Sequence, residues 1–308
     1  MRSLAISFLQ KALTLFVVIT LTFFLMKALP GDPFNQEKAL PKEIYNALRQ
    51  HYGLDAPMSE QYLRYLKQSL TLDFGPSFRY KDRTVNQIIW EGFPVSATIG
   101  LEVLFFALAV GISLGSWAAL QKQMWPDQLV LGGTTLSMAL PGFILAALLQ
   151  YLLALKLGWF PVARWGTLSH TFLPALALAV IPAAFIARLV RSSLLEVYRQ
   201  DYIRTARIKG ISERRILWGH ALRNALLPVL SYIGPLAANI LVGSFAVETI
   251  FALPGLGQWF VTSVLNRDYT VIMGLTVFFS LILLAFLSLT EAAALLLDPR
   301  LRKKEEVV

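Results

Sequence analysis

Long apolar blocks alternate with polar segments along the whole chain. Six blocks of about 20 or more mostly apolar residues occupy 8–29, 95–119, 129–155, 171–195, 226–250 and 270–297. A helix of this length crosses the hydrocarbon core of a bilayer. Lipid offers no hydrogen bonds to a bare backbone, and the blocks lack the ten-residue alternation of barrel strands. The pattern predicts an all-α polytopic membrane protein with six transmembrane helices.

These blocks also divide the chain into regions. We expect an N-terminal transmembrane helix over 1–30, an extracytoplasmic segment over 31–94, a five-helix core over 95–297 and a tail over 298–308. The first block ends at Met26-Lys-Ala-Leu-Pro30 without a small-x-small cleavage site, which indicates an uncleaved anchor. The extracytoplasmic segment predicts helices over 41–52 and 58–70. A short amphipathic helix over 84–90 is expected to lie at the outer surface.

The basic clusters between the predicted spans all fall on one side of the membrane. Arg2, Lys11, Lys122, the Arg188–Arg223 cluster and the basic tail fall on one side, while 30–94 carries eight basic and eight acidic residues. Short basic loops stay in the cytoplasm, so both termini are expected to be cytoplasmic and the protein multi-pass in the inner membrane. The net charge of +9 is therefore a topology signal, and no nucleic-acid partner is expected.

The loop between the fourth and fifth spans, about 197–224, has a pattern beyond simple charge. Leu195, Tyr198, Tyr202 and Ala206 recur at helical spacing and give one apolar face flanked by arginines. Gly210 suits the left-handed residue that ends a helix, and Ser212 can cap the next. We expect a short helix, a sharp turn and a second helix. Such an amphipathic helix fits a groove in a cytoplasmic partner.

Several chemistries are excluded or disfavoured by the residues present. The chain has no Gly-x-x-x-x-Gly-Lys loop for nucleotide, no cysteine, and three histidines without a His-Glu-x-x-His pair. An enzyme is therefore disfavoured. An ion-coupled secondary transporter or channel is the stronger rival, since Glu102 and Glu291 lie within predicted spans. Neither has an obvious basic mate there. Each acid is expected to line a polar cavity or to lie at a subunit interface, the second favoured slightly for Glu291.

The loop also resembles a known family. Arg204-Thr-Ala206, Gly210 and His220-Ala-Leu222 resemble the Glu-Ala-Ala…Gly loop of ABC-importer permeases, and the departures at Arg204, Thr205 and Arg223 match the peptide/nickel branch. Other segments extend the resemblance to the B-type membrane subunit of oligopeptide permeases, and they are 28–34 (ALPGDPF), 73–78 (DFGPSF), 93–96 (FPVS), 248–257 (ETIFALPGLG), 266–269 (NRDY) and 298–300 (DPR).

The resemblance implies a type I ABC-importer permease fold and a role in oligopeptide or dipeptide import. Dipeptide, nickel or another small solute remain alternative cargoes. It implies a sister permease in a heterodimer, two ATP-binding subunits and an extracytoplasmic peptide-binding protein. No cofactor is expected on this chain, because ATP and Mg would be bound by partner subunits. The 199–215 helix would couple to the ATPases through Tyr202, Arg204, Thr205, Ala206, Arg207, Gly210 and His220.

Six helices make a bundle too small for a wide peptide path. We therefore expect the path to lie between this chain and its sister, lined by spans two to five. Pro141, Gly142, Pro174 and Pro182 are expected to bend helices around it.

Overall fold

The computed structural model describes residues 2–28, 34 and 41–297, and all regular elements in these ranges are helices apart from an isolated bridge between Pro76 and Thr84. The first four helices are α1 (Arg2–Ala28), α2 (Lys42–His51), α3 (Met58–Thr71) and α4 (Val85–Leu120). Next come α5 (Trp125–Ala139), α6 (Gly142–Leu149), the π-helix η1 (Gln150–Lys156) and α7 (Leu168–Val197). The loop region holds α8 (Asp201–Ile208), α9 (Glu213–Ile216), the π-helix η2 (Leu217–Ala221) and α10 (Leu222–Ala225). The chain continues through α11 (Leu227–Leu241), α12 (Phe245–Ile250), α13 (Leu256–Asn266) and α14 (Tyr269–Leu297).

Four helices are long and apolar enough to cross a membrane: α1, α4, α7 and α14. Two bent pairs pass the same test together, which gives up to six spans. The first pair is 125–139 with 142–156, bent by 100°, and the second is 213–225 with 227–241, bent by 55°. The predicted all-helical membrane protein is therefore confirmed.

Two predicted spans differ from the observed helices. The apolar block 129–155 is not one straight helix, because the chain turns sharply between Ala139 and Gly142. The block 226–250 ends as a helix at Leu241; Gly243 then adopts a φ of +93° and α12 starts in a new direction. Hydropathy is uniform across both breaks, so it carries no sign of the change in direction.

The predicted surface helix over 84–90 is wrong in its placement. Thr84 caps α4 directly, with its hydroxyl accepting from the Gln87 amide at 3.2 Å, and this stretch forms the first turns of the long helix. Val85 and Ile88 are fully buried against α14 and its neighbours. The apolar side of the segment therefore packs inside the protein rather than onto lipid headgroups.

The centre of the molecule is the pairing of α4 with α7. Gly111 and Gly115 let the two backbones approach closely, since a Cβ at Gly115 would lie 2.4 Å from the Ala187 carbonyl oxygen. Small residues at such crossings let apolar helices pack by shape alone within a bilayer. Ala183 and Ala187 of α7 are buried on the opposite side of the same contact.

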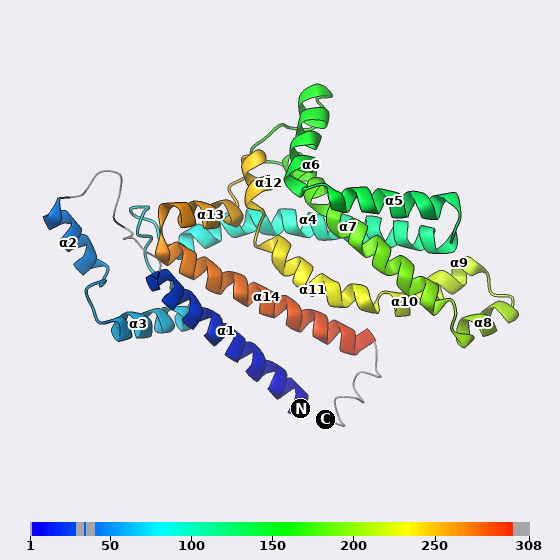
Figure 1. Cartoon of the computed structure of the whole chain (residues 1–308), viewed down its shortest axis with the longest axis horizontal. Helices are drawn as coiled ribbons and strands as arrows, with labels where there is room; N and C mark the ends of the chain where they lie inside the picture. The colour runs from blue at the N-terminus through cyan, green and yellow to red at the C-terminus, as the bar shows by residue number, and fades with distance from the viewer. Residues whose placement is uncertain (1, 29–33, 35–40, 298–308) are drawn as a thin grey trace.

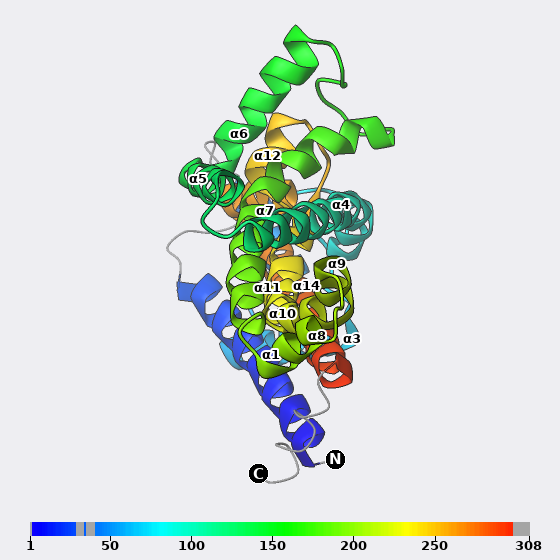
Figure 2. The ribbon, with the colours of Figure 1, turned by 90° about the vertical axis from the view of Figure 1, so that its right-hand side faces the viewer.

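The helices lie mostly along the long axis of the molecule (Figure 1). The α4–α5 turn and the α8–α10 loop lie at the right-hand end in Figure 1, whereas the start of α1 lies below the middle of the molecule. The other end holds α2, α3 and α13. We call the end that carries the α4–α5 turn and the basic α8–α10 loop the basic end. The helix that begins at α6 projects away from the bundle (Figures 1 and 2).

Candidate functional site

The α8–α9 pair forms a compact helical hairpin at the basic end of the molecule. The Ile211 amide donates to the Ala206 carbonyl at 3.2 Å and the Gly210 amide to the Arg207 carbonyl at 2.9 Å. These two bonds and the φ of +75° at Gly210 make a Schellman termination of α8. The predicted short helix, turn and second helix are observed. Ser212 precedes α9, but its side chain makes no capping hydrogen bond.

The apolar face of α8 is occupied by the protein itself. Ile203 is fully buried and Ala206 is 8% exposed, and both pack in the main hydrophobic core. The sequence predicted an apolar face here, but assigned it to a partner groove. Burial of this face against α8's own bundle holds the helix rigidly. The outward side of the helix and its C-cap carries exposed side chains, namely Tyr202, Arg204, Thr205, Ile208 and Lys209.

Arg207 fastens α8 to α9. Its Nε donates to Glu213 Oε1 at 2.7 Å and its Nη2 to Oε2 at 3.2 Å, while the guanidinium lies 5.4 Å from the Tyr198 ring centroid. The hydrogen bonds to Glu213 raise the pKa of Arg207, and burial raises the pKa of Tyr198. Arg207 therefore remains cationic and Tyr198 neutral at physiological pH. The pair is exposed, so it orients the hairpin more than it stabilises it.

The remaining predicted coupling residues lie around this hairpin. The Tyr202 hydroxyl accepts from Asn224 Nδ2 at 2.7 Å, which ties α8 to α10. His220 is exposed on η2, and so is Trp218, two positions earlier in the same element. We define the coupling surface as the exposed side chains of Tyr202, Arg204, Thr205, Ile208, Lys209, Trp218 and His220. Ile208 and Trp218 were not singled out from the sequence. Both are large apolar residues in an otherwise basic and polar loop, and this contrast could have marked them as contact residues.

A buried carboxylate on α12 joins α4 to the start of α13 by hydrogen bonds. Glu248 is 2% exposed; its Oε1 accepts from Ser96 Oγ at 2.9 Å and its Oε2 from the Gln258 amide at 2.8 Å. Glycines enclose it, since a Cβ at Gly243 would lie 2.3 Å from Oε1 and one at Gly255 2.4 Å from Cδ. The 93–96 and 248–257 segments therefore meet through one network, a role the sequence did not reveal.

A second buried acid joins the extracytoplasmic segment to α14. Asp268 accepts from the Ser77 hydroxyl and, at 3.1 Å, from the Phe78 amide. It also caps α14, since the Val271 amide donates to it at 3.4 Å. Segments 73–78 and 266–269 are thus partners in space. The segments 29–33 and 298–300, together with the predicted tail, lie outside the described residues.

The two acids singled out inside the spans have different surroundings. Glu291 has a basic mate, contrary to the prediction, because Lys11 Nζ donates to its Oε2 at 2.6 Å. This contact joins α14 to α1 within the chain. Glu102 Oε1 accepts from Thr171 Oγ1 at 2.7 Å, and Oε2 is buried without a partner among the described residues. Glu102 therefore lies in the α4–α7 contact.

The predicted bend positions divide into two groups. Pro141 and Gly142 lie at the 100° break between α5 and α6. Pro174 and Pro182 lie within α7, which continues through both as one helix. In the part of the chain that the structure describes, no group of three or more His, Asp or Glu side chains is arranged to hold a metal ion.

Comparison with known proteins decides the family. The family "Binding-protein-dependent transport system inner membrane component" matches residues 111–303, and its N-terminal counterpart matches residues 1–100. The chain belongs to this family. It is thus a membrane component of a transport system and not an enzyme, and ATP hydrolysis in such systems is carried out by separate subunits. The family also implies ATPase and substrate-binding partners in general, and a multi-pass location in the inner membrane.

Named relatives match over almost the whole chain. It is 48% identical to the dipeptide transport system permease protein DppB of Bacillus subtilis over 94% of both chains. It is 43% identical to the oligopeptide transport system permease protein OppB of Salmonella typhimurium, over 94% of this chain and 95% of that protein. The predicted peptide branch of the ABC-importer permeases is therefore confirmed.

Solved structures give the fold. Inward-facing MetNI methionine ABC transporter matches with a TM-score of 0.53 and 18% identity, covering 68% of this chain and 93% of that chain. An amino acid ABC transporter matches with a TM-score of 0.50 and 17% identity, covering 68% and 94%. At this identity the likeness concerns fold alone. It confirms the predicted type I ABC-importer permease fold.

Proposed function

We propose that the chain is one membrane-spanning subunit of an ATP-driven importer that moves peptides into the cell. The observation that carries the proposal is the coupling surface, which is displayed on a helical hairpin packed into the core. The named relatives of the chain are dipeptide and oligopeptide permeases. Both relative names specify peptides, so peptide is the proposed cargo. ATP and Mg would bind to partner subunits.

The hairpin suits mechanical coupling for two reasons. Its inner face packs in the hydrophobic core through Ile203 and Ala206. A displacement of α8 is therefore transmitted directly to the transmembrane helices. Its outer face combines cationic Arg204 and Lys209 with exposed apolar Ile208. An acidic-rimmed apolar groove on an ATPase would match such a face. Closure of the ATPases would then move hairpin and bundle together as a rigid body.

The basic end that carries the hairpin is proposed to be cytoplasmic, with both termini on that side. The opposite end, with α2, α3 and α13, would then receive peptide from an extracytoplasmic peptide-binding protein. Positive charge on short loops is the physical support for this orientation.

A sister permease is proposed to pack on the projecting helix formed by α6 and η1. Apolar and aromatic side chains are exposed along it, and they are Phe143, Ile144, Leu148, Tyr151, Leu152 and Leu155. The helix is bent by 100° relative to α5 and projects away from the bundle, so its own chain does not cover it on all sides. The heterodimer would cover this surface, and the peptide path would lie between the two subunits. Two ATP-binding subunits would complete the complex.

Site-specific crosslinking tests the coupling surface in this cysteine-free chain. A cysteine at Ile208, which is 80% exposed, should crosslink to an ATP-binding subunit in native membranes. The matched variant is Ala206→Cys on the buried face of the same helix, and it should crosslink at least tenfold less. Equal capture at both positions, or no ATPase captured at Ile208, would rule out docking through this face.

A further inference from the structure

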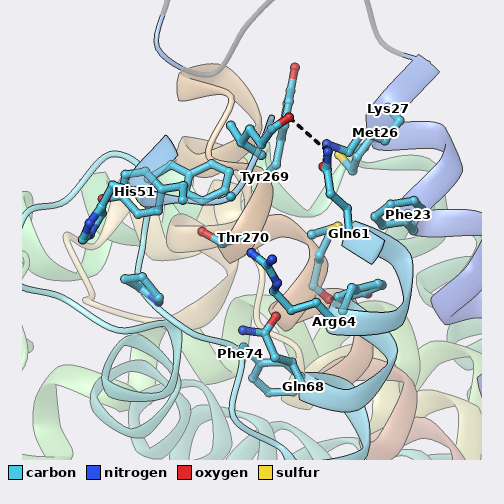
Figure 3. A pocket seen from close by; sticks show the side chains of 17 residues that line it. Phe23, Met26, Lys27, His51, Gln61, Arg64, Gln68, Phe74, Tyr269 and Thr270 are labelled. Atoms are coloured by element: carbon cyan, nitrogen blue, oxygen red, sulfur yellow. Dashed lines mark hydrogen bonds between the residues drawn. The ribbon is translucent and has the colours of Figure 1, made fainter. Parts of the chain in front are cut away.

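A cavity of about 230 Å³ (Figure 3) lies beside α3, at the end of the molecule opposite the coupling surface (Figure 1). Its walls come from α1, α3 and the start of α14, together with segments 51–54 and 74–78. One water molecule occupies roughly 30 Å³ of the liquid, so the cavity has room for a small polar group with several heavy atoms. The cavity lies apart from the coupling surface, although Phe74 and Tyr269 of the 73–78 and 266–269 segments line it.

The charged side chains that line this cavity are cationic. Lys27 and Arg64 both contribute to the wall, and no Asp or Glu is among the described residues that form it. Arg64 makes an exposed ion pair with Glu60 at 3.1 Å, which is weak in water and uses one of five guanidinium N–H groups. Gln68 adds an amide on the same side of α3 as Arg64 (Figure 3). The Gln61 amide is already occupied, since its Nε2 donates to the Leu54 and Ala56 carbonyls and its Oε1 accepts from Lys27. Such a lining favours an anion.

The turn before α3 is built to accommodate the arginine. Gly53 has a φ of +64°, and a Cβ there would lie 2.0 Å from Arg64 Nη1. A larger residue would therefore both strain the turn and displace the guanidinium. Aromatic side chains complete the wall, including Phe23, Tyr65 and Phe74. The cation is thus held in position beside an apolar surface.

The end of the apolar helix α1 beside the cavity indicates that the cavity lies near the level of the lipid headgroups. Leu21, Phe24 and Leu25 are exposed on α1 as lipid-facing side chains, and α1 ends one residue after Lys27. Lysine and tyrosine typically mark this boundary, because their apolar stems remain in the hydrocarbon while their polar ends reach the interface. The abundant anion at that depth is the phosphate of a phospholipid.

We propose that this cavity binds the phosphate-bearing headgroup of an anionic phospholipid from the adjacent leaflet. Arg64 provides the main charge-assisted hydrogen bonds, Lys27 adds its charge at the rim, and the acyl chains run along the exposed apolar side of α1. Bound lipid would join α1 to the extracytoplasmic segment. This role is separate from peptide transport and from the docking of ATPases.

Native mass spectrometry of the delipidated full-chain complex tests the proposal. Phosphatidylglycerol should bind at least fivefold more tightly than phosphatidylcholine with the same acyl chains. Arg64→Gln should remove most of this preference. Lys67→Gln, which removes an equal charge from an exposed position of α3 outside the cavity, should leave it unchanged. Met273→Trp fills the cavity without altering charge and should also weaken phosphatidylglycerol binding.

Three outcomes would overturn the proposal. Equal losses in Arg64→Gln and Lys67→Gln would mean that general surface charge attracts the lipid. Full binding in Met273→Trp would mean that the headgroup lies outside the cavity. Displacement of phosphatidylglycerol by inorganic phosphate at equal concentration would assign the site to a soluble anion instead of a lipid.

Discussion

At the scale of single residues, a few backbone and carboxylate positions determine how the coupling surface and the core are built. Gly210 ends α8 at a φ of +75°, and no atom lies within 4 Å of the place where its Cβ would be. Its requirement is therefore conformational and not steric. Glu248 is the reverse case, because the surrounding glycines leave room for its carboxylate and nothing larger.

Replacing Gly210 by valine should uncouple transport. A left-handed conformation costs an L-residue about 1–2 kcal/mol, and a β-branched one more, so the α8–α9 turn should rearrange. We expect normal assembly and ATP hydrolysis but at least a tenfold loss of ATP-driven peptide uptake. The control is Gly210→Asn at the same position, because asparagine tolerates the left-handed conformation at a helix end and should retain coupling. Wild-type uptake by Gly210→Val would contradict the account.

Replacing Glu248 by glutamine should destabilise the fold. The carboxylate accepts from Ser96 and from the Gln258 amide, whereas an amide side chain can accept on one side only. One buried donor is then left unsatisfied, which costs about 1–3 kcal/mol. The thermal unfolding midpoint in detergent should fall by several degrees. Thr249→Ala, at an exposed position of the same helix, should leave the midpoint nearly unchanged.

At the scale of elements, the sequence predicted which segments are helical but not every direction or contact. The helices over 41–52 and 58–70, the α8–α9 hairpin and the turn at Gly210 are all where the pattern placed them. The breaks at 140–141 and after Leu241 were not predicted as span ends, because lipid selects equally apolar residues on both sides of a bend. Pro141 lies at a break between two helices, whereas Pro174 lies within the continuous helix α7. The presence of a proline alone therefore does not predict where a helix breaks.

Polar contacts between residues far apart in the chain could not be predicted from the sequence either. Ser96 meets Glu248 from 152 positions away, and Ser77 meets Asp268 from 191 positions away. No periodicity links such residues in a single chain. The predicted apolar face of α8 was right for Ala206 but wrong for Tyr202, which is exposed, and Ile203 is buried in its place. The buried face contacts the protein's own core instead of a partner. Both kinds of surface have the same amphipathic pattern, so pattern alone cannot tell them apart.

The projecting α6–η1 helix should contact a second membrane subunit. Leu148 is exposed on it, and Ala146 is fully buried two positions earlier. A cysteine at Leu148 should crosslink to a sister permease in native membranes, whereas Ala146→Cys should not. If Leu148→Cys crosslinks only to lipid-like probes and to no subunit, this helix faces the bilayer and the heterodimer contact lies elsewhere.

At the scale of the whole molecule, the basic end and the α2–α3 end should lie on opposite sides of the membrane. A membrane-impermeant maleimide added to intact cells should label Lys81→Cys, in the exposed loop before α4. The same reagent should label Thr205→Cys, on the coupling surface, only after the membrane is opened. Labelling in the reverse order would place the termini outside and remove the coupling surface from the reach of cytoplasmic ATPases.

The central claim is that the chain moves peptide only as part of an ATP-driven complex. The most direct measurement is uptake of a labelled peptide by proteoliposomes that contain the chain with its sister permease, ATP-binding subunits and binding protein. The account predicts accumulation that requires ATP and stops when this chain is omitted. Uptake by this chain alone, driven by an ion gradient in the absence of ATP, would contradict it and indicate a secondary transporter.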